Sequence, residues 1–361
     1  MTIIRSDGRQ HPRVTIATIA TDAPMGAQAY QEQVARRAAS ALEQIDDRAW
    51  TVRRLVVRSL RARLPGNRRL PMGRVSAASA ETRRAIGRVL YGRDTVTHRM
   101  NLELPPSPGA DVITLHDVVA WRFPDESAPV PAAVEEARRA AAVICVSSFS
   151  AREAIELLGI SEPHVIHNGV DDRFFDADPL PTDVRQALGL PAEYVLHAGG
   201  ASRRKNLEGL AEAWPTVHRE RPNVRLVLAG PAHSRRSTLF EGMPGVILTG
   251  RLPDAVMPGL VAGAAAVVVP SLYEGFGLPA LEAMAANVPV VAAETSSLPE
   301  VVGDAGFLVQ PTGRAIAEGL IAATSGDEQV ATLVSAGRRR ASMFTWERCA
   351  EEHARVWSSV A

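Results

Sequence analysis

The stretch AAAVVVPSLYEGFGLPALEAMAANVPVV (264–291) shows the unit from which the chain is built. Its apolar run, AAAVVVPS (264–271), has the length and continuity of a strand buried on both faces of a parallel sheet. A loop with Gly275 and Gly277 follows, and Pro279 suits the first turn of the next helix, where no backbone N–H is needed. A strand that turns directly into a helix predicts an α/β fold.

This loop also has the composition of a phosphate-binding turn. Its glycines let the backbone amides of Phe276, Gly277 and Leu278 approach an anion, which the dipole of the following helix favours. Glu274 at the loop end and Glu282, expected in the first helical turn, could accept hydrogen bonds from sugar hydroxyls. The alternative is an ordinary turn in which Glu282 only favours the helix N-terminus.

The same alternation of strands and helices runs through the whole chain, and a Pro- and Asp-rich stretch at 171–183 is the expected linker between two series. Parallel sheets with right-handed crossovers are therefore predicted in both halves. The expected strands of the first half are 14–20, 50–57, 111–117, 142–148 and 164–169, and its helices are 29–44, 131–141 and 149–159. The expected strands of the second half are 194–200, 224–230, 245–250, 264–271 and 288–294.

Size and composition fit two globular domains of a cytoplasmic protein. The chain has 361 residues, 46% of them hydrophobic and 22% charged, and single cores stop growing beyond roughly 250–300 residues. Its longest apolar stretch, 259–270, is shorter than the roughly 20 residues that cross a bilayer. Cys145 and Cys349 are too few for a disulfide framework.

Net charge is zero, but residues 48–99 hold fourteen arginines against Glu81 and Asp94, a local charge of +12. One interpretation is a surface for anionic lipid, an anionic glycan or a phosphorylated acceptor, which would place the protein at the inner face of the plasma membrane. The other is a set of solvated helix faces. No aromatic residues are interleaved as in nucleic-acid sites, so no nucleic-acid partner is expected.

A second loop, ASRRKNLEGL (201–210), leaves a predicted strand and leads into a helix that Asn206 is expected to cap. Arg203, Arg204 and Lys205 would lie where the helix dipole is already positive, an unfavourable placement unless an anion shares the site. A diphosphate would relieve it. The alternative is that all three side chains point into solvent.

The two loops together describe a site for a nucleotide-diphosphate sugar, and here the sequence resembles the family-4 retaining glycosyltransferases of the GT-B fold. The family's pattern of two glutamates separated by seven residues stands at Glu274 and Glu282. The likeness extends from about residue 111 to the end of the chain. It is carried by PSLYEGFGLPALEAMA (270–285), GGASRRKNLEGLAEAW (199–214), VIHNGVD (165–171), VSSFSARE (146–153) and SSLPEVVGDAGFLV (296–309).

The resemblance implies roles for the glycine loop and the basic loop. Glu274 would hold hydroxyls of the transferred sugar and Glu282 the ribose, while Gly275 and the amides of 276–278 would contact sugar and phosphate. Lys205, with Arg203 or Arg204, would neutralise the departing diphosphate. No metal or other cofactor is expected. Two departures from the family pattern bear on these roles: Ala201 follows Gly200 where an Arg is common, and Asn287 stands where a Gly is usual.

The resemblance also implies a domain division. Two Rossmann-like domains would face a central cleft, with acceptor binding in residues 1–178 and donor binding in 179–343. The last helix, 344–361, would cross back to the N-terminal domain. A hinge near 172–182 and 343 would then close the domains.

Two loops of the N-terminal half are weaker candidates. His116 and Asp117 end the predicted strand at 111–117. By resemblance His116 would contact the donor sugar and the transition state, since in retaining members the leaving phosphate is thought to take the proton; the alternative is a His satisfied by nearby backbone. Gly26, in the turn 21–30, would lie near the diphosphate and acceptor, although an ordinary strand-to-helix turn fits equally.

The expected function is transfer of a hexose from a nucleotide-diphosphate sugar to a hydroxyl acceptor in cell-envelope glycan, glycolipid or polysaccharide synthesis. TLHDVVAWRFPD (114–125) looks most like mannosyl-type members, which favours GDP-mannose. The alternatives are a small secondary metabolite glycosylated from a UDP- or dTDP-sugar, a nucleotide-sugar epimerase of the same fold, and a non-catalytic sugar-binding protein. A nicotinamide-dependent oxidoreductase is disfavoured because the first strand-to-helix turn lacks G-x-G-x-x-G.

Overall fold

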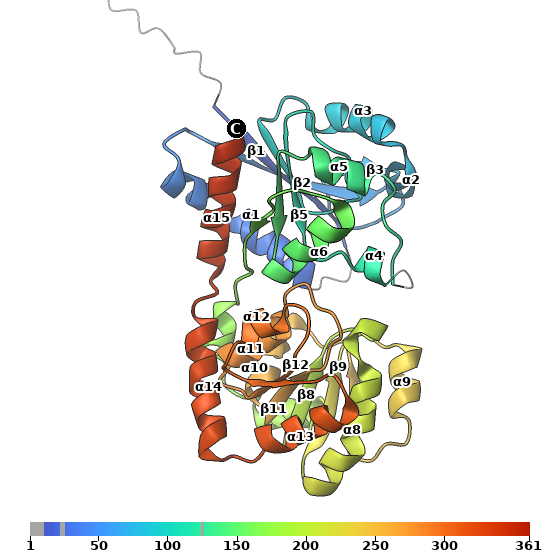
Figure 1. Cartoon of the computed structure of the whole chain (residues 1–361), viewed down its shortest axis with the longest axis vertical. Helices are drawn as coiled ribbons and strands as arrows, with labels where there is room; N and C mark the ends of the chain where they lie inside the picture. The colour runs from blue at the N-terminus through green and yellow to red at the C-terminus, as the bar shows by residue number, and fades with distance from the viewer. Residues whose placement is uncertain (1–10, 22–25, 124–125) are drawn as a thin grey trace, which may run out of the picture. The chain divides into compact units, whose positions relative to one another are not determined.

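The computed structural model describes residues 11–21, 26–123 and 126–361, which form two compact units (Figure 1). Unit 1 comprises the described residues up to Val146 together with Ala151–Ile166 and Trp346–Ala361. Unit 2 comprises Ser147–Ser150 and His167–Thr345. Each unit is a parallel sheet flanked by helices, so the predicted α/β class with two Rossmann-like domains is confirmed.

Unit 1 is built on a seven-stranded sheet in the order β3-β2-β1-β4-β5-β6-β7, with every described pairing parallel. The strands are β1 (Arg13–Ile19), β2 (Thr51–Ser59), β3 (Arg68–Leu70), β4 (Val96–Arg99), β5 (Ala110–Leu115), β6 (Ala142–Cys145) and β7 (His164–Val165). The helices are α1 (Gly26–Ile45), α2 (Met72–Ala77), α3 (Ala80–Tyr91), α4 (Val119–Arg122), α5 (Ala133–Arg139), α6 (Ser148–Leu158, whose first turn belongs to unit 2) and α15 (Trp346–Val360).

The last helix, α15, packs against α1 in unit 1, as the resemblance implies. A buried chain of hydrogen bonds joins it to α1 and to the sheet. Each side chain donates to the next: Trp357 to His98, His98 to Thr114, Thr114 to Tyr30 and Tyr30 to His353. His353 in turn donates to the carbonyl oxygen of Cys349. Because a carbonyl only accepts, His353 carries its proton on Nδ1, and its Nε2 accepts from the Tyr30 hydroxyl at 2.6 Å.

Unit 2 is built on a six-stranded parallel sheet in the order β10-β9-β8-β11-β12-β13. The strands are β8 (Tyr194–Ala198), β9 (Arg225–Ala229), β10 (Val246–Gly250), β11 (Ala266–Val269), β12 (Val290–Ala293) and β13 (Phe307–Val309). The α-helices are α7 (Thr182–Ala187), α8 (Leu207–Glu220), α9 (Ser234–Phe240), α10 (Met257–Ala262), α11 (Leu278–Ala285), α12 (Leu298–Val302), α13 (Gly313–Ala323) and α14 (Glu328–Ala341). β10 is an edge strand with no fully buried residue, although its apolar run resembles those of the buried strands.

The segment expected to link the domains is part of unit 2 instead. The amide of Val170 donates to the carbonyl oxygen of Phe344 at 3.0 Å, and Arg338 donates to the carbonyl oxygen of Phe175 at 2.8 Å. Phe174, in a short 3-10 helix at Asp172–Phe174, is buried. These contacts explain why the unit boundary lies at residues 166 and 167, rather than at 178 as predicted.

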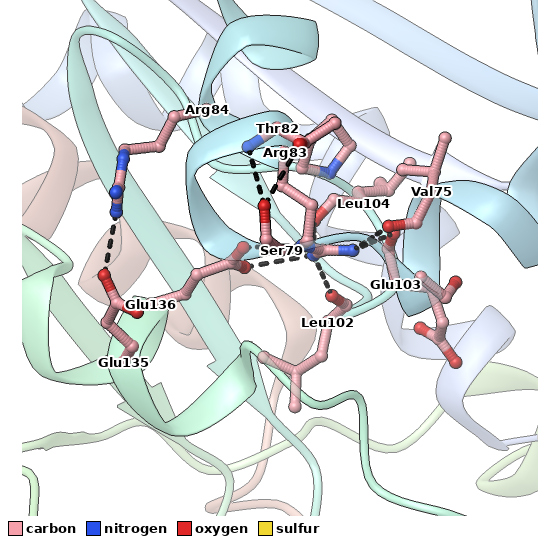
Figure 2. A network of polar contacts seen from close by, with 12 residues as sticks. Val75, Ser79, Thr82, Arg83, Arg84, Leu102, Glu103, Leu104, Glu135 and Glu136 are labelled. Atoms are coloured by element: carbon pink, nitrogen blue, oxygen red, sulfur yellow. Dashed lines mark hydrogen bonds and ion pairs between the residues drawn. The ribbon is translucent and has the colours of Figure 1, made fainter.

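The arginine-rich segment 48–99 is not a single charged surface. Arg83 and Arg99 are fully buried and form ion pairs with Glu136 and Asp111 (Figure 2 shows the Arg83 contacts). Arg99 lies on β4, a strand that the sequence analysis missed because its residues are mostly polar. In the described ranges, no helix combines the length and the apolar character that crossing a bilayer requires.

Candidate functional site

The basic loop after β8 and the glycine loop after β11 meet at the carboxyl end of the unit 2 sheet. β8 and β11 are neighbours in that sheet, so the loops that leave them lie side by side. The amide of Leu272 donates to the carbonyl oxygen of Arg204 at 2.7 Å. Asn206 donates from Nδ2 to the carbonyl oxygens of Pro270 and Pro311, each at 3.0 Å.

Asn206 fixes the start of α8, as predicted. It has the left-handed backbone conformation (φ 51°), which Asn tolerates better than most residues. Its Oδ1 accepts from the amide of Gly209 at 3.2 Å, and this satisfies one of the unpaired donors of the first helical turn. The same side chain therefore caps the helix and ties it to the glycine loop.

Glu274 lies where the basic loop and the glycine loop meet. The residue is only 6% exposed, and its carboxylate accepts from Lys205 Nζ at 2.6 Å, from Ser271 Oγ at 2.7 Å and from Arg204 Nη1 at 3.3 Å. Burial by itself would raise the pKa of Glu274, but the charges of Lys205 and Arg204 outweigh it and hold the pKa below its usual value. The result is an ionised carboxylate flanked by two cations.

The turn that follows Glu274 presents backbone N–H groups. Gly277 precedes α11 with φ 111°, a conformation that favours glycine, and a Cβ there would lie 2.8 Å from the Leu298 side chain. Ser147 and Ser150 donate to the carbonyl oxygen of Gly275 at 2.7 and 2.9 Å, and Ser297 donates to that of Phe276 at 2.7 Å. Among the described residues, the amides of 275–277 donate to no protein acceptor, so they can bind a ligand.

Glu282 lies on the same helix with different surroundings. It is the fifth residue of α11, so the prediction that it sits in the first turn is wrong. Burial, together with the nearby charges of Asp254 and Asp171, raises the pKa of Glu282 to about 7. Among the described residues its carboxylate takes part in no hydrogen bond, so its oxygens are not engaged by the protein.

The structure distinguishes the arginines that the sequence analysis left open. Arg204 reaches Glu274, whereas Arg203 is exposed to solvent. Arg236, on α9, was missed: it is 2% exposed and donates to the carbonyl oxygens of Gly199 and Gly200 at 2.5 and 3.1 Å. Its position after a predicted strand, in PAHSRR (231–236), was the available signal.

Asn287, where the family usually has glycine, has φ 57° in the turn after α11. Asn is the residue next to Gly in its tolerance of this conformation. The substitution therefore keeps the turn.

The candidates in unit 1 follow β5. His116 is half-buried with its ring edge-on to Tyr30 at 4.6 Å, and burial, with a smaller effect of His353, lowers its pKa to about 4. Its imidazole is therefore neutral at pH 7. Asp117 accepts from the amide of Val119 at 3.1 Å and so orders the start of α4. Gly26 is the first residue of α1, and residues 22–25 of that predicted turn lie outside the described residues.

Comparisons with known proteins agree with this arrangement. Residues 192–325 match the family model described as "Glycosyl transferases group 1", and residues 107–174 match "Glycosyltransferase Family 4". O-antigen chain mannosyltransferase B of Escherichia coli is 30% identical over 278 residues, which cover 71% of this chain and 72% of that protein. The chain belongs to family 4 of the glycosyltransferases.

Other family members and structures extend the likeness of this glycosyltransferase. A GDP-mannose-dependent alpha-(1-6)-phosphatidylinositol dimannoside mannosyltransferase of Mycobacterium tuberculosis is 32% identical over 213 residues, covering 58% of this chain and 55% of that protein. Sucrose-phosphate synthase of Thermosynechococcus elongatus has a TM-score of 0.73 at 22% identity over 96% of this chain and 99% of that one. WaaG, a glycosyltransferase involved in lipopolysaccharide biosynthesis, has a TM-score of 0.71 at 17% identity; the match covers 95% of this chain and 99% of WaaG. The fold is GT-B.

Proposed function

We propose that this glycosyltransferase moves mannose from GDP-mannose to a hydroxyl acceptor, with retention of anomeric configuration, in the synthesis of a cell-envelope glycan, glycolipid or polysaccharide. Two relatives support the sugar: one is named as an O-antigen chain mannosyltransferase and the other as GDP-mannose-dependent. The names also support a glycan or lipid-linked acceptor.

The observation that carries the proposal is the meeting of Lys205, Arg204 and Glu274 beside the free amides of 275–277. Two cations and a row of N–H donors suit a diphosphate. Negative charge grows on the diphosphate as the bond to the sugar breaks, and fixed donors stabilise it most in that state. The proposal therefore includes no metal cofactor, because Lys205 and Arg204 supply the positive charge.

The remaining residues take roles that fit their surroundings. Glu274 is ionised, so it can accept from hydroxyls of the transferred sugar while it orients Lys205. Glu282, whose carboxylate is not engaged among the described residues, accepts from or donates to the ribose. Retention is explained if the leaving phosphate takes the acceptor's proton, so that His116, neutral at pH 7, contacts the sugar rather than acting as a base.

Peripheral contact with the inner face of the plasma membrane is also proposed for unit 1. Leu60 and Val89 are 55% and 88% exposed, and each basic side chain near anionic lipid contributes about 1 kcal/mol. The exposed arginines that have no acidic partner among the described residues are Arg61, Arg63, Arg68, Arg69, Arg74, Arg88 and Arg93.

A thermal-shift screen tests the donor. The protein is heated with GDP-mannose, UDP-glucose, UDP-N-acetylglucosamine or dTDP-rhamnose; a ligand at a hundred times its Kd stabilises the native state by about 2.7 kcal/mol. We expect GDP-mannose to raise the melting temperature most. A larger rise in melting temperature with a UDP- or dTDP-sugar would contradict GDP-mannose as the donor. It would favour the alternative of a small-metabolite acceptor. The anomeric configuration of the product, read by NMR, tests retention.

Incubation with the donor alone separates transfer from epimerisation. A transferase releases only slow hydrolysis products without an acceptor, whereas an epimerase converts the nucleotide sugar. Accumulation of a second hexose or its nucleotide in the absence of acceptor would contradict the transferase proposal.

A further inference from the structure

Arg236 is a buried cation to which the roles above give no function. It is the third residue of α9, and only 2% of it is exposed. Within the described ranges it forms no ion pair: Nη1 and Nη2 donate to carbonyl oxygens alone, and Nε is buried without an acceptor. Burial lowers the pKa of Arg236, and no acidic group offsets that effect. Because an arginine stays protonated in proteins, a positive charge is buried here without a counter-ion.

The acceptors of Arg236 belong to two loops that meet at the carboxyl end of the unit 2 sheet. Pro231, after β9, accepts from Nη1 at 3.0 Å. Gly199 and Gly200, after β8, accept from Nη2 at 2.5 and 3.1 Å. Gly230 allows the loops to approach, because it has φ 149° and a Cβ there would lie 2.0 Å from the carbonyl oxygen of Gly199. That carbonyl therefore points towards the end of β9.

The N–H groups of the same two peptides point away from Arg236. Every peptide bond of the described chain is trans, and in a trans peptide the N–H lies opposite to the C=O. The carbonyls of Gly199 and Gly200 therefore direct the amides of Gly200 and Ala201 to the other side. β8 lies between β9 and β11 in the sheet, so the Gly200 amide, turned away from the end of β9, faces the side of β11 and its glycine loop.

The turn at Gly200 and Ala201 can receive a ligand. Neither amide donates to an acceptor among the described residues. A Cβ at Gly200 would meet no described atom within 4 Å beyond its chain neighbours. Ala201 has no polar side chain, so the turn offers a ligand only its N–H groups. Two successive N–H groups that point to one side suit an anion.

The charges around the turn also favour an anion. His197, buried beside Gly199, is neutral at pH 7, because burial and then the charges of Lys205 and Arg236 lower its pKa to about 3. The two cations thus act on the same point of the loop. Glu274 binds Lys205 and leaves Arg236 uncompensated. An uncompensated buried charge destabilises the fold, and a negative ligand beyond the two peptides would offset that cost.

We propose that Arg236 is a positioning residue of the donor site: by holding the carbonyls of Gly199 and Gly200, it points the amides of Gly200 and Ala201 at the diphosphate. The guanidinium acts through the backbone and does not touch the ligand. A cation at the carbonyl end also polarises each peptide, which makes its N–H a stronger donor. The inference rests on the proposed function, because it adds a second set of donors, opposite the amides of 275–277, for the same diphosphate.

Binding of GDP and of guanosine tests the inference, because only GDP carries phosphates. The Kd of GDP is measured by isothermal titration calorimetry and that of guanosine by ligand-observed NMR. We expect Arg236→Met to weaken GDP binding by at least about 10-fold, the loss of one hydrogen bond to a charged group, and to bind guanosine as wild type does. Arg236→Lys keeps the charge and can hold one carbonyl, so its loss of GDP affinity should be smaller.

Arg235→Met is the matched control. Arg235 is the preceding residue of α9, and its Nε donates to Glu208 at 2.9 Å, so its replacement removes an arginine from the same helix without freeing the carbonyls of Gly199 and Gly200. GDP binding in this variant should equal that of wild type. An equal loss in Arg235→Met and Arg236→Met would show a general effect of charge and overturn the inference.

A purely structural role of Arg236 gives a different result. A lower melting temperature with unchanged GDP affinity in Arg236→Met, or equal weakening of GDP and guanosine, overturns the inference. If Arg236→Met does not fold, Arg236→Lys decides, and wild-type GDP affinity there overturns it. UDP and uridine replace the guanine pair if UDP binds wild type more tightly. Wild-type protein that binds neither diphosphate contradicts the proposed function, and the inference with it.

Discussion

Lys205 offers the sharpest perturbation of the proposed donor site. Its ammonium group lies 2.6 Å from Glu274 Oε1, and the two side chains are 13% and 9% exposed. Removing one partner of a buried ion pair costs roughly 3–5 kcal/mol when the other is left alone. Glu274 still keeps Arg204 at 3.3 Å and Ser271 at 2.7 Å, so we expect Lys205→Ala to cost less, about 1–3 kcal/mol.

A loss of that size lowers the melting temperature by about 2–12 °C, since 1 kcal/mol shifts a domain of 150–250 residues by roughly 2–4 °C. The effect on turnover should be larger. If Lys205 neutralises the leaving diphosphate, its removal takes away a fixed charge worth about 10²–10³-fold in kcat. The protein would therefore be folded at 25 °C and nearly inactive.

The assay is release of nucleoside diphosphate from the donor that the thermal-shift screen identifies, followed at 25 °C with saturating donor. Ser271→Ala is the matched control, because it removes another hydrogen bond to the same oxygen of Glu274 and keeps both cations. We expect a loss of less than 10-fold there. Wild-type kcat in Lys205→Ala, or equal losses in the two variants, would refute the role of Lys205.

Three further predictions follow from charges and pKa values. Lys205 is the only lysine in the sequence, so an amine-specific reagent should modify one side chain, and a bound nucleoside diphosphate should protect it when peptides are analysed by mass spectrometry. The pKa of Glu282 is raised to about 7 from 4.5; the folded state therefore loses stability as pH rises from 4.5 through 7, and Glu282→Gln should melt higher than wild type at pH 8 but not at pH 4.5. The pKa of His353 is lowered from 6.5 to about 4 by burial; stability should be lost as pH falls below 6.5, by about 2 kcal/mol at pH 5. Urea unfolding at pH 7 and pH 5 measures this loss of stability, which should be smaller in His353→Gln than in wild type. An identical loss in the two proteins would contradict the hydrogen-bond chain through Tyr30.

Much of the fold could be predicted from the sequence because the deciding signals are local. Continuous apolar runs predicted β8, β9, β11 and β12 within a few residues. Gly277 and Asn206 were recognised as turn and cap residues: Gly277 has the positive φ that its turn requires, and the Asn206 side chain caps α8. The resemblance identified the family and the GT-B fold, which the comparisons confirm. The roles of the individual site residues stay predictions.

What the sequence hid depends on partners far along the chain. β4 carries His98 and Arg99, polar residues that are buried because Trp357, Asp111 and Glu136 satisfy them. Residues 171–178 looked like a linker because proline and aspartate mark turns, whereas their carbonyls and side chains find partners on α14 and nearby loops.

By itself the sequence determined that the chain forms parallel α/β units with a basic loop and a glycine loop after two strands, since periodicity, caps and turns act between neighbouring residues. Only the tertiary structure decided that Arg204 rather than Arg203 reaches Glu274, and that the pKa of Glu274 falls while that of Glu282 rises. Both carboxyls are withdrawn from water. Their pKa values diverge because folding brings two cations to one and two carboxylates towards the other, and those charges come from distant positions in the chain.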